Sequence, residues 1–152
     1  AGANKLTDIV KKIGAFKPLV SGFKAVADAM DDAVAHARSR KAFGVQVGRF
    51  QQIETLLTDM EVRLRNMRSM VYRAAWSIDA ADETERLDVA LMKRYVPEAS
   101  DAMQILGGLG YTEGSRVSRI WEDCRGNQIA EGTDQVMVYI AAPLIMEHYR
   151  SF

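Results

Sequence analysis

A glutamate in the last quarter of the chain has surroundings that suit proton-transfer chemistry. Glu131 lies in the run Gln128-Ile129-Ala130-Glu131-Gly132-Thr133, among apolar or small neighbours. A carboxylate in a poorly hydrated pocket has a raised pKa and can serve as a general base near neutral pH. A carboxylate just before a helix instead caps that helix and favours its dipole. The local sequence leaves both interpretations open.

An arginine and a glycine cluster are candidates for binding an anion or a nucleotide. Arg40 is expected at a helix C-terminus, where it either offsets the helix dipole or binds an anion such as a phosphate. The run Gly107-Gly108-Leu109-Gly110 lacks the preceding strand and the G-x-G-x-x-G spacing of a Rossmann fingerprint. It predicts a helix stop and a tight loop, with close approach of a ligand to its backbone as the alternative.

The remaining charged or reactive side chains indicate no separate site. Four arginines between residues 63 and 73 are interrupted by acidic residues, which favours a solvated helix face with local ion pairs. The single cysteine is interpreted as a small buried hydrophobe. Two histidines and one cysteine are too few for a typical structural zinc site, so no metal is expected. These residues are Arg63, Arg65, Arg68, Arg73, Cys124, His36 and His148.

The composition is that of an ordinary globular domain. The chain has 152 residues, 48% of them apolar, with 20 Lys+Arg balanced by 20 Asp+Glu. This length predicts one domain, and the neutral charge argues against a nucleic-acid binder or a polybasic membrane anchor. No apolar run approaches a membrane span. One cysteine excludes a disulfide scaffold, and no signal peptide is evident at the start, so we expect an intracellular protein.

Helical periodicity dominates the chain, and no convincing strand alternation is present. Long helices are expected over residues 16–41, 49–80, 83–106 and about 131–149, with a short one over 117–123. Residues 4–13 are either a separate helix or the same first helix kinked at Pro18. Pro97 predicts a kink near Arg94. Four long helices with short connections predict an all-α, up-down four-helix bundle of antiparallel helices.

Three segments together resemble the acyl-CoA dehydrogenase family. Arg40-x-x-Phe43-Gly44, with Phe50-Gln51 and Asp59-Met60 downstream, resembles the family's R-x-x-F-G…Q…D-M run. Gln104-Ile105-Leu106-Gly107-Gly108-Leu109-Gly110-Tyr111 resembles its Q-I-x-G-G-x-G-Y segment. The stretch from Glu122-Asp123-Cys124-Arg125 to Glu131-Gly132-Thr133 resembles its R-D-A-R…I-x-E-G-T. The order and spacing of the three segments make the resemblance specific, and it covers residues 22–148.

The resemblance implies the family's C-terminal helical domain, a four-helix bundle with FAD bound at its edge. These enzymes oxidise an acyl-CoA thioester to the trans-2-enoyl-CoA, and by motif match Glu131 is the base that removes the α-proton. The match also implies contacts with FAD, with Arg40 reaching the pyrophosphate, commonly of a neighbouring subunit. The residues implied to contact the cofactor are Arg40, Phe43, Gln51, Gln104, Gly107, Gly108, Thr133 and Gln135.

The resemblance sets further expectations about the whole protein. Residues 1–152 form a single helical domain, with residues 1–15 an extension or the start of the first helix. The family's N-terminal helical domain and middle β-domain are missing from it, so the isolated chain is expected to be inactive. A homodimer or tetramer in the bacterial cytoplasm or mitochondrial matrix is implied. The alternatives are a non-catalytic oligomerisation or interaction module derived from the family, and an acyl-CoA oxidase-type relative.

Overall fold

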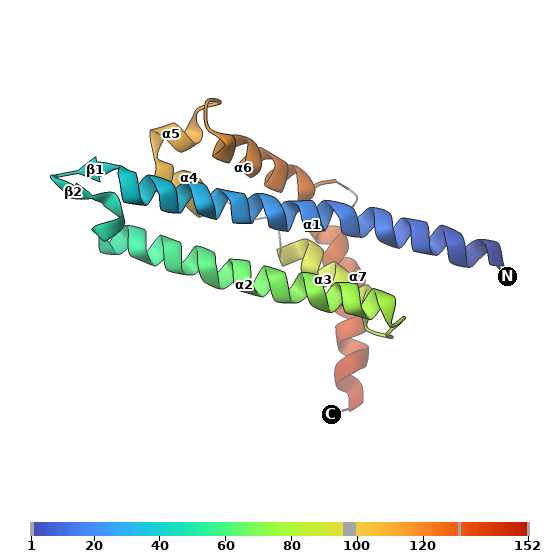
Figure 1. Ribbon diagram of the computed structural model, residues 1–152. Coiled ribbons are helices and arrows are strands. Elements are labelled where there is room, and N and C mark those ends of the chain that lie inside the picture. The colour runs from blue at the N-terminus through green and yellow to red at the C-terminus, as the bar shows by residue number, and fades with distance from the viewer. Residues whose placement is uncertain (1, 96–99, 131, 152) are drawn as a thin grey trace.

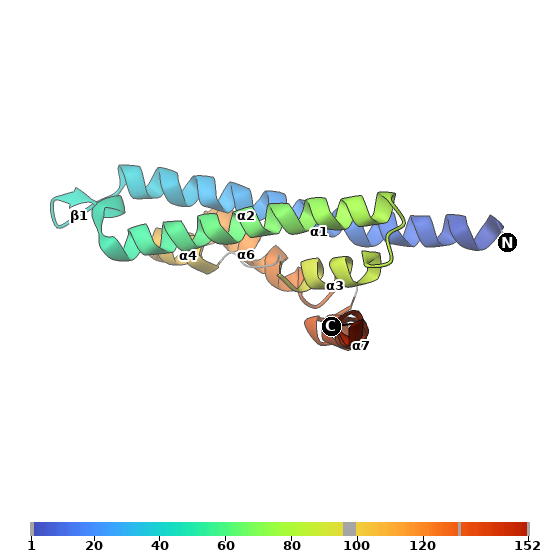
Figure 2. The same cartoon turned by 90° about the horizontal axis from the view of Figure 1, so that it is seen from below.

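Two long helices form the frame of the molecule. The computed structural model describes residues 2–95, 100–130 and 132–151. Helices α1 (Gly2–Ser39) and α2 (Gln51–Asp79) run antiparallel and side by side (Figure 1, Figure 2). Helix α1 continues through Pro18, so residues 4–13 belong to the first helix. The expected all-α fold is confirmed for the described residues, apart from one small hairpin.

That hairpin joins α1 to α2 at one end of the bundle (Figure 1). Strands β1 (Lys41–Ala42) and β2 (Val45–Gln46) pair antiparallel, and a 3-10 helix, η1 (Val47–Arg49), leads into α2. The two residues between the strands, Phe43 and Gly44, have φ values of 51° and 84°. Positive φ at both positions is the geometry of a type I′ turn. The sequence pattern predicts no strand here, because two residues per strand are too few to show alternation.

Shorter helices follow along the frame. The helix expected over residues 83–106 is present as α3 (Glu85–Tyr95) and α4 (Ser100–Leu106), and Pro97 lies outside the described residues. Gly107, with φ of 60°, ends α4 and confirms the predicted helix stop. Helices α5 (Gly108–Tyr111) and α6 (Arg116–Asn127) come next, and the Ser115 hydroxyl accepts a hydrogen bond from the Val117 N–H at the start of α6.

The main core lies where α1, α2, α4 and α6 meet. Helix α2 contributes side chains at three- and four-residue spacing, which places them on one stripe. Helix α1 contributes mainly alanines, whose small side chains let the neighbouring helices approach closely. The buried residues of this core include Val26, Ala29, Ala33, Ala37, Met60, Leu64, Met67, Val71, Ala74, Ala102, Ile105, Val117, Ile120 and Cys124.

The last helix packs separately against α3. Helix α7 (Asp134–His148) lies across the direction of α1 and α2, and Figure 2 shows it nearly end-on. Met137 and Ala141 of α7 are buried against Ala90 of α3 in a second, smaller cluster. A 3-10 turn, η2 (Tyr149–Ser151), follows α7. Among the described residues, no helix is both long and apolar enough to cross a membrane.

Candidate active site

The loop between α6 and α7 is closed by backbone hydrogen bonds. The Ala130 N–H donates to the carbonyl of Gly126 at 2.9 Å, which continues the end of α6 as a turn. The Asp134 N–H donates to the carbonyl of Gln128 at 3.1 Å and joins the two ends of the loop. Glu131, the predicted base, lies outside the described residues. The residues on either side of it therefore define the site.

The residues just after position 131 turn the chain into α7. Gly132 has φ of 104°, a conformation that L-residues rarely adopt. A Cβ on Gly132 would lie 2.9 Å from Cε of Met137. Thr133 is the N-cap of α7, and its hydroxyl accepts a hydrogen bond from the Val136 N–H at 3.3 Å. The N-cap of α7 is thus Thr133, and the capping role considered for Glu131 concerns a residue outside the described ones.

The first turn of α7 presents one exposed amide and one half-buried acid. Gln135 is exposed. Asp134 Oδ1 is buried and, among the described residues, has no hydrogen-bond partner. A carboxylate is electrostatically favoured at a helix N-terminus. A buried acceptor without a partner is nevertheless uncommon and fits a place where a ligand donates.

A buried lysine holds this loop from another helix. Lys93 of α3 is only 7% exposed. Its Nζ donates to the carbonyls of Asn127 at 3.2 Å, Ala130 at 2.8 Å and Gly132 at 2.6 Å. Lys93 is not among the site residues predicted from the sequence, because it lies off the apolar stripe expected for its helix. The one feature of the sequence that could have indicated a buried lysine is its position directly after the apolar stretch of residues 89–92.

The hairpin end of the bundle carries a second group of predicted residues. Arg40 joins α1 to the hairpin: its N–H donates to the His36 carbonyl at 2.8 Å, and its carbonyl accepts from the Val47 N–H at 2.9 Å. Its side chain is exposed. Phe43 is 97% exposed at the tip of the hairpin. Positive φ is a genuine outlier for a bulky residue and is retained mainly where function requires it.

Further members of this group lie close to the hairpin. Gln51 is the first residue of α2, Gln104 lies on α4, and both side chains are exposed. A Cβ added to Gly107 or Gly108 would meet nothing within 4 Å, so the backbone there is open to a ligand. In Figure 1 and Figure 2 the hairpin and the α4–α5 segment occupy the same end of the bundle.

The predicted site residues therefore divide into two groups. The hairpin-end group lies at one end of the bundle, whereas the α6–α7 loop lies beyond the middle of α1, away from the hairpin (Figure 1). We call the second set the loop group. The hairpin-end group comprises Arg40, Phe43, Gln51, Gln104, Gly107 and Gly108, and the loop group comprises Thr133 and Gln135, which flank position 131.

Comparisons with known proteins match nearly the whole chain. Residues 19–145 match the family model described as acyl-CoA dehydrogenase, C-terminal domain. The chain belongs to the acyl-CoA dehydrogenase family. It is 41% identical over 128 residues to a probable acyl-CoA dehydrogenase of Escherichia coli K12, YdiO, covering 81% of this chain and 33% of the relative.

Solved structures show the same fold. An acyl-CoA dehydrogenase from Slackia heliotrinireducens superimposes with a TM-score of 0.87 and 48% identity, covering 100% of this chain and 41% of that chain. Butyryl-CoA dehydrogenase from Megasphaera elsdenii superimposes with a TM-score of 0.82 and 28% identity, covering 89% of this chain and 36% of that chain. The chain thus spans about a third of the length of the curated relatives that it matches.

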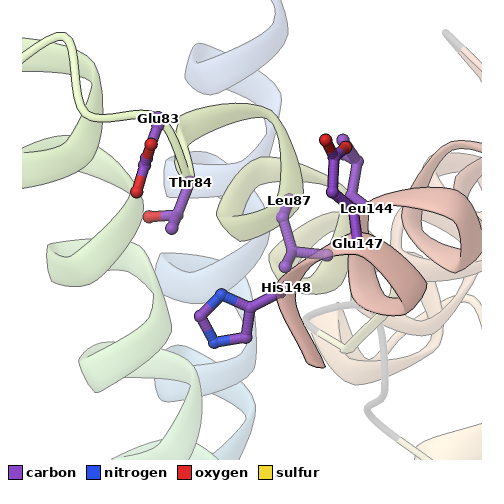
Figure 3. A pocket seen from close by; sticks show the side chains of 6 residues that line it. All are labelled: Glu83, Thr84, Leu87, Leu144, Glu147 and His148. Atoms are coloured by element: carbon purple, nitrogen blue, oxygen red, sulfur yellow. The ribbon is translucent and has the colours of Figure 1, made fainter. Parts of the chain in front are cut away.

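A pocket of this acyl-CoA dehydrogenase domain lies away from the loop group. It has a volume of about 380 Å³ and lies between the start of α3 and the C-terminal end of α7. In Figure 3, Glu83, Thr84 and Leu87 line one side and Leu144, Glu147 and His148 line the other. Thr133 lies at the opposite end of α7. None of the predicted site residues that the structure describes lines this pocket.

The arginines of α2 only partly match the prediction of a helix face with local ion pairs. Arg65 forms such a pair within the helix, whereas Arg63, Arg68 and Arg73 contact residues of α4, α1 and α3. Cys124 is buried, and this burial raises the pKa of its thiol to about 11. The arginine contacts are Arg63 with Asp101 at 2.6 Å, Arg65 with Glu61 at 2.8 Å, Arg73 with Asp88 at 2.9 Å, and Arg68 over the Phe23 ring at 5.8 Å.

Proposed function

We propose that this chain supplies the catalytic base and part of the FAD site of an acyl-CoA dehydrogenase. The observation that carries the proposal is the construction of the α6–α7 loop. The hydrogen bond from Asp134 to Gln128 closes it, and Gly132 and Thr133 turn it into α7. Thr133 supplies the cap of α7, so the helix does not require a carboxylate two residues earlier for that purpose.

The proposed reaction needs a base of this type. The α-proton of a thioester is weakly acidic, so a desolvated carboxylate must remove it while the carbonyl is polarised. Glu131 takes the α-proton and becomes a neutral carboxylic acid. The hydride leaves the β-carbon, and bound FAD supplies the acceptor for it. The acyl-CoA loses one proton and one hydride, which gives the trans-2-enoyl-CoA.

The hairpin-end group suits FAD in its chemistry. The Arg40 guanidinium is a planar donor that matches phosphate oxygens. Phe43 offers an exposed apolar ring on a strained turn, and the open backbone at Gly107 and Gly108 permits close approach of a ligand. The amides of Gln51 and Gln104 add polar groups that can donate or accept. These residues fit a cofactor that combines a pyrophosphate with flat rings.

We place the two groups of residues at different FAD molecules of a homo-oligomer. In each site one copy contributes Glu131, Thr133 and Gln135, and a second copy contributes the hairpin-end group. This arrangement explains the separation of the two groups along the bundle (Figure 1). Helix α7 supports assembly because it is apolar on most sides, a property of helices that are covered by other elements. Its exposed apolar residues are Val136, Val138, Tyr139, Ile145 and Met146.

We further propose that the 152-residue chain alone neither retains FAD nor turns over an acyl-CoA. It spans about a third of the length of its relatives, and the other domains of the family supply the rest of the acyl-CoA cleft. Purified chain is expected to show no bound flavin spectrum. A flavin spectrum together with acyl-CoA-dependent dye reduction would contradict this.

The test of the base uses a full-length enzyme. This chain replaces the matching third of the E. coli relative, and the fusion is assayed for FAD content and acyl-CoA-dependent dye reduction. Glu131→Gln keeps the size of the side chain but removes the proton acceptor. We expect turnover to fall by about 10²–10⁴-fold, with FAD retained. The control is Glu113→Gln, an exposed glutamate between α5 and α6.

The outcome separates this function from a second one, assembly without catalysis. The exposed apolar surface of α7 is what favours an assembly module. If the Glu131→Gln fusion binds FAD, oligomerises and turns over like its parent, Glu131 is not the base, and the assembly role is the better account of this domain.

A further inference from the structure

The ammonium group of Lys93 is matched to three backbone carbonyls. A buried ammonium is costly unless its donors are satisfied. Lysine carries N–H donors and no acceptor, and Nζ of Lys93 donates to the carbonyls of Asn127, Ala130 and Gly132, at 3.2, 2.8 and 2.6 Å. Residue 93 is 34 to 39 positions distant from these carbonyls in sequence, so the contacts are tertiary.

One of these carbonyls belongs to the end of a helix. Asn127 is the last residue of α6, where backbone carbonyls lack partners within the helix. The negative end of the helix dipole also favours a cation there. Lys93 therefore caps α6 at the point where the α6–α7 loop begins.

The other two carbonyls flank the predicted base. The Ala130 carbonyl belongs to the peptide plane that enters residue 131, and the Gly132 carbonyl lies one residue beyond it. Lys93 thus holds the backbone on both sides of position 131. Helix α3 also packs on α7, since Ala90 contacts the cluster around Met137 and Ala141. The same short helix thus orients both the loop and the helix after it.

We infer that Lys93 is a positioning residue for the base Glu131, an inference that rests on the proposed function. Proton abstraction requires the carboxylate to lie within reach of the substrate α-carbon, and a displacement of about 1 Å can cost about 10²-fold in rate. Lys93 limits such displacement through the backbone. It acts through Glu131 and not on the substrate.

The first experiment measures how firmly Lys93 holds the loop in the 152-residue chain. Lys93→Met keeps the length of the side chain and removes its three donors. We expect faster amide hydrogen exchange at residues 128–134 in this variant, with residues 22–39 of α1 unchanged. The control is Lys24→Met, an exposed lysine on α1. Unchanged exchange at 128–134 in Lys93→Met overturns the inference.

The second experiment tests positioning in the full-length fusion. Flavin reduction is followed in a single turnover with unlabelled and α-deuterated acyl-CoA. For Lys93→Met we expect the rate constant to fall by about 10²-fold, a larger α-deuterium isotope effect and little change in substrate affinity. Lys93→Arg, which keeps the charge and several donors, should recover part of the rate.

A merely structural role gives a different signature. Loss of folded enzyme lowers the amplitude of flavin reduction, but leaves the rate constant and isotope effect of the remaining enzyme unchanged. That result in Lys93→Met sinks the inference. Glu131→Gln, measured in parallel, separates the two proposals. If Glu131→Gln is slow and Lys93→Met is normal, only the positioning role fails, whereas a normal rate in Glu131→Gln removes the proposed function itself.

Discussion

Arg116 on α6 and Asp32 on α1 form a bidentate ion pair. The Nε–Oδ2 distance is 2.6 Å and the Nη2–Oδ1 distance is 2.9 Å, and the two residues are 84 positions apart in sequence. Arg116 Nη2 also donates to the carbonyl of Asp28 at 3.2 Å. The hydrogen bond to Asp32 raises the pKa of Arg116. This contact ties the start of α6, and thereby the helix that leads to the α6–α7 loop, to the frame of the molecule.

The geometry of this pair predicts that Arg116→Lys is not a conservative change. Lysine keeps the charge but cannot make the two parallel hydrogen bonds. We expect a small decrease in the unfolding temperature, measured by circular dichroism, which shrinks in 1 M salt because the pair is exposed to solvent. Arg119→Lys, on the same helix and exposed, is the control. If the decreases in stability caused by Arg116→Lys and by Asp32→Asn add up fully in the double variant, the two side chains are not coupled.

Substitution of two glycines by alanine is predicted to have opposite effects. Gly132→Ala forces a side chain into a positive φ of 104° and toward Cε of Met137. We expect it to destabilise the chain by about 1–2 kcal/mol. Gly126→Ala in α6 meets nothing within 4 Å and is expected to stabilise the chain by about 0.5–1 kcal/mol. Urea unfolding measures both, and equal effects of the two changes would show that backbone conformation at residue 132 does not matter.

Gly132→Ala also has an expected effect on activity. In the full-length fusion it should lower turnover more than Gly126→Ala, because it moves the backbone next to Glu131. The comparison uses the rate per bound flavin, so that a loss of folded enzyme does not count as a loss of rate. Equal rates per flavin in the two variants would contradict a role of this turn in presenting the base.

The helices were predictable from sequence to different degrees. The apolar stripe of α2 was clear because large residues recur at helical spacing, and Met60, Leu64 and Met67 are buried as predicted. On α1 the periodicity favoured Met30 and Val34, which are only half-buried, whereas Ala29 and Ala33 are fully buried. Alanine carries little hydrophobic signal, and its burial follows from how closely the neighbouring helices approach.

The site was less predictable than the helices. The segments around Arg40, Gly107 and Glu131 stand out by their residue types, only the resemblance chooses among their possible roles, and those roles remain predictions. The contacts of Lys93 were out of reach, because all three acceptors are backbone carbonyls and leave no trace in residue types. The hairpin turn at Phe43 was missed for a related reason. Its strand pairs are too short for a pattern, and phenylalanine is not a usual residue at positive φ.

Burial of Cys124 predicts a specific pH dependence. Its thiol has a pKa of about 11 in the folded chain, above the ordinary thiol value that applies when the chain is unfolded. Between these two values the unfolded chain releases a proton that the folded chain keeps, so the free energy of unfolding falls as the pH rises. Urea unfolding between about pH 8 and 11 should show this decrease, and Cys124→Ala should reduce its slope.

Chemical labelling gives an independent check on the same thiol. Only the thiolate reacts with iodoacetamide, and Cys124 is buried as well as protonated near neutral pH. We expect labelling in the native chain to be much slower than in urea. Rapid labelling of the native chain would show that α6 opens readily, and the decrease in stability at high pH would then have to be assigned to other groups.

Complementation between two inactive variants tests whether the two groups of site residues act across copies. In the full-length fusion, Arg40→Ala removes the proposed pyrophosphate contact and Glu131→Gln removes the proposed base. We expect each variant alone to be nearly inactive. If a site uses Glu131 of one copy and Arg40 of another, a mixed dimer contains one site with both defects and one intact site. Random mixing should then restore activity to about a quarter of the sites.

The contrary arrangement predicts no recovery. If Arg40 and Glu131 of the same copy served one FAD, every site in the mixture would carry a defect, and turnover would stay at the level of the separate variants.

The control mixes Glu131→Gln with Gln135→Ala, since both positions belong to the α6–α7 loop region and are assigned to the same site. In the mixed dimer of that pair each site carries one of the two changes, so no activity should be recovered, provided that both single variants are inactive. Recovery in both mixtures would contradict the assignment of Glu131 and Gln135 to one copy. A same-copy double variant, Arg40→Ala with Glu131→Gln, mixed with the parent enzyme gives an independent test. When the groups act across copies, each site of the dimer formed by a double-variant chain and a parent chain receives one defect. The activity of the mixture then falls below the fraction of parent chains in it. When the groups act within one copy, the activity equals that fraction.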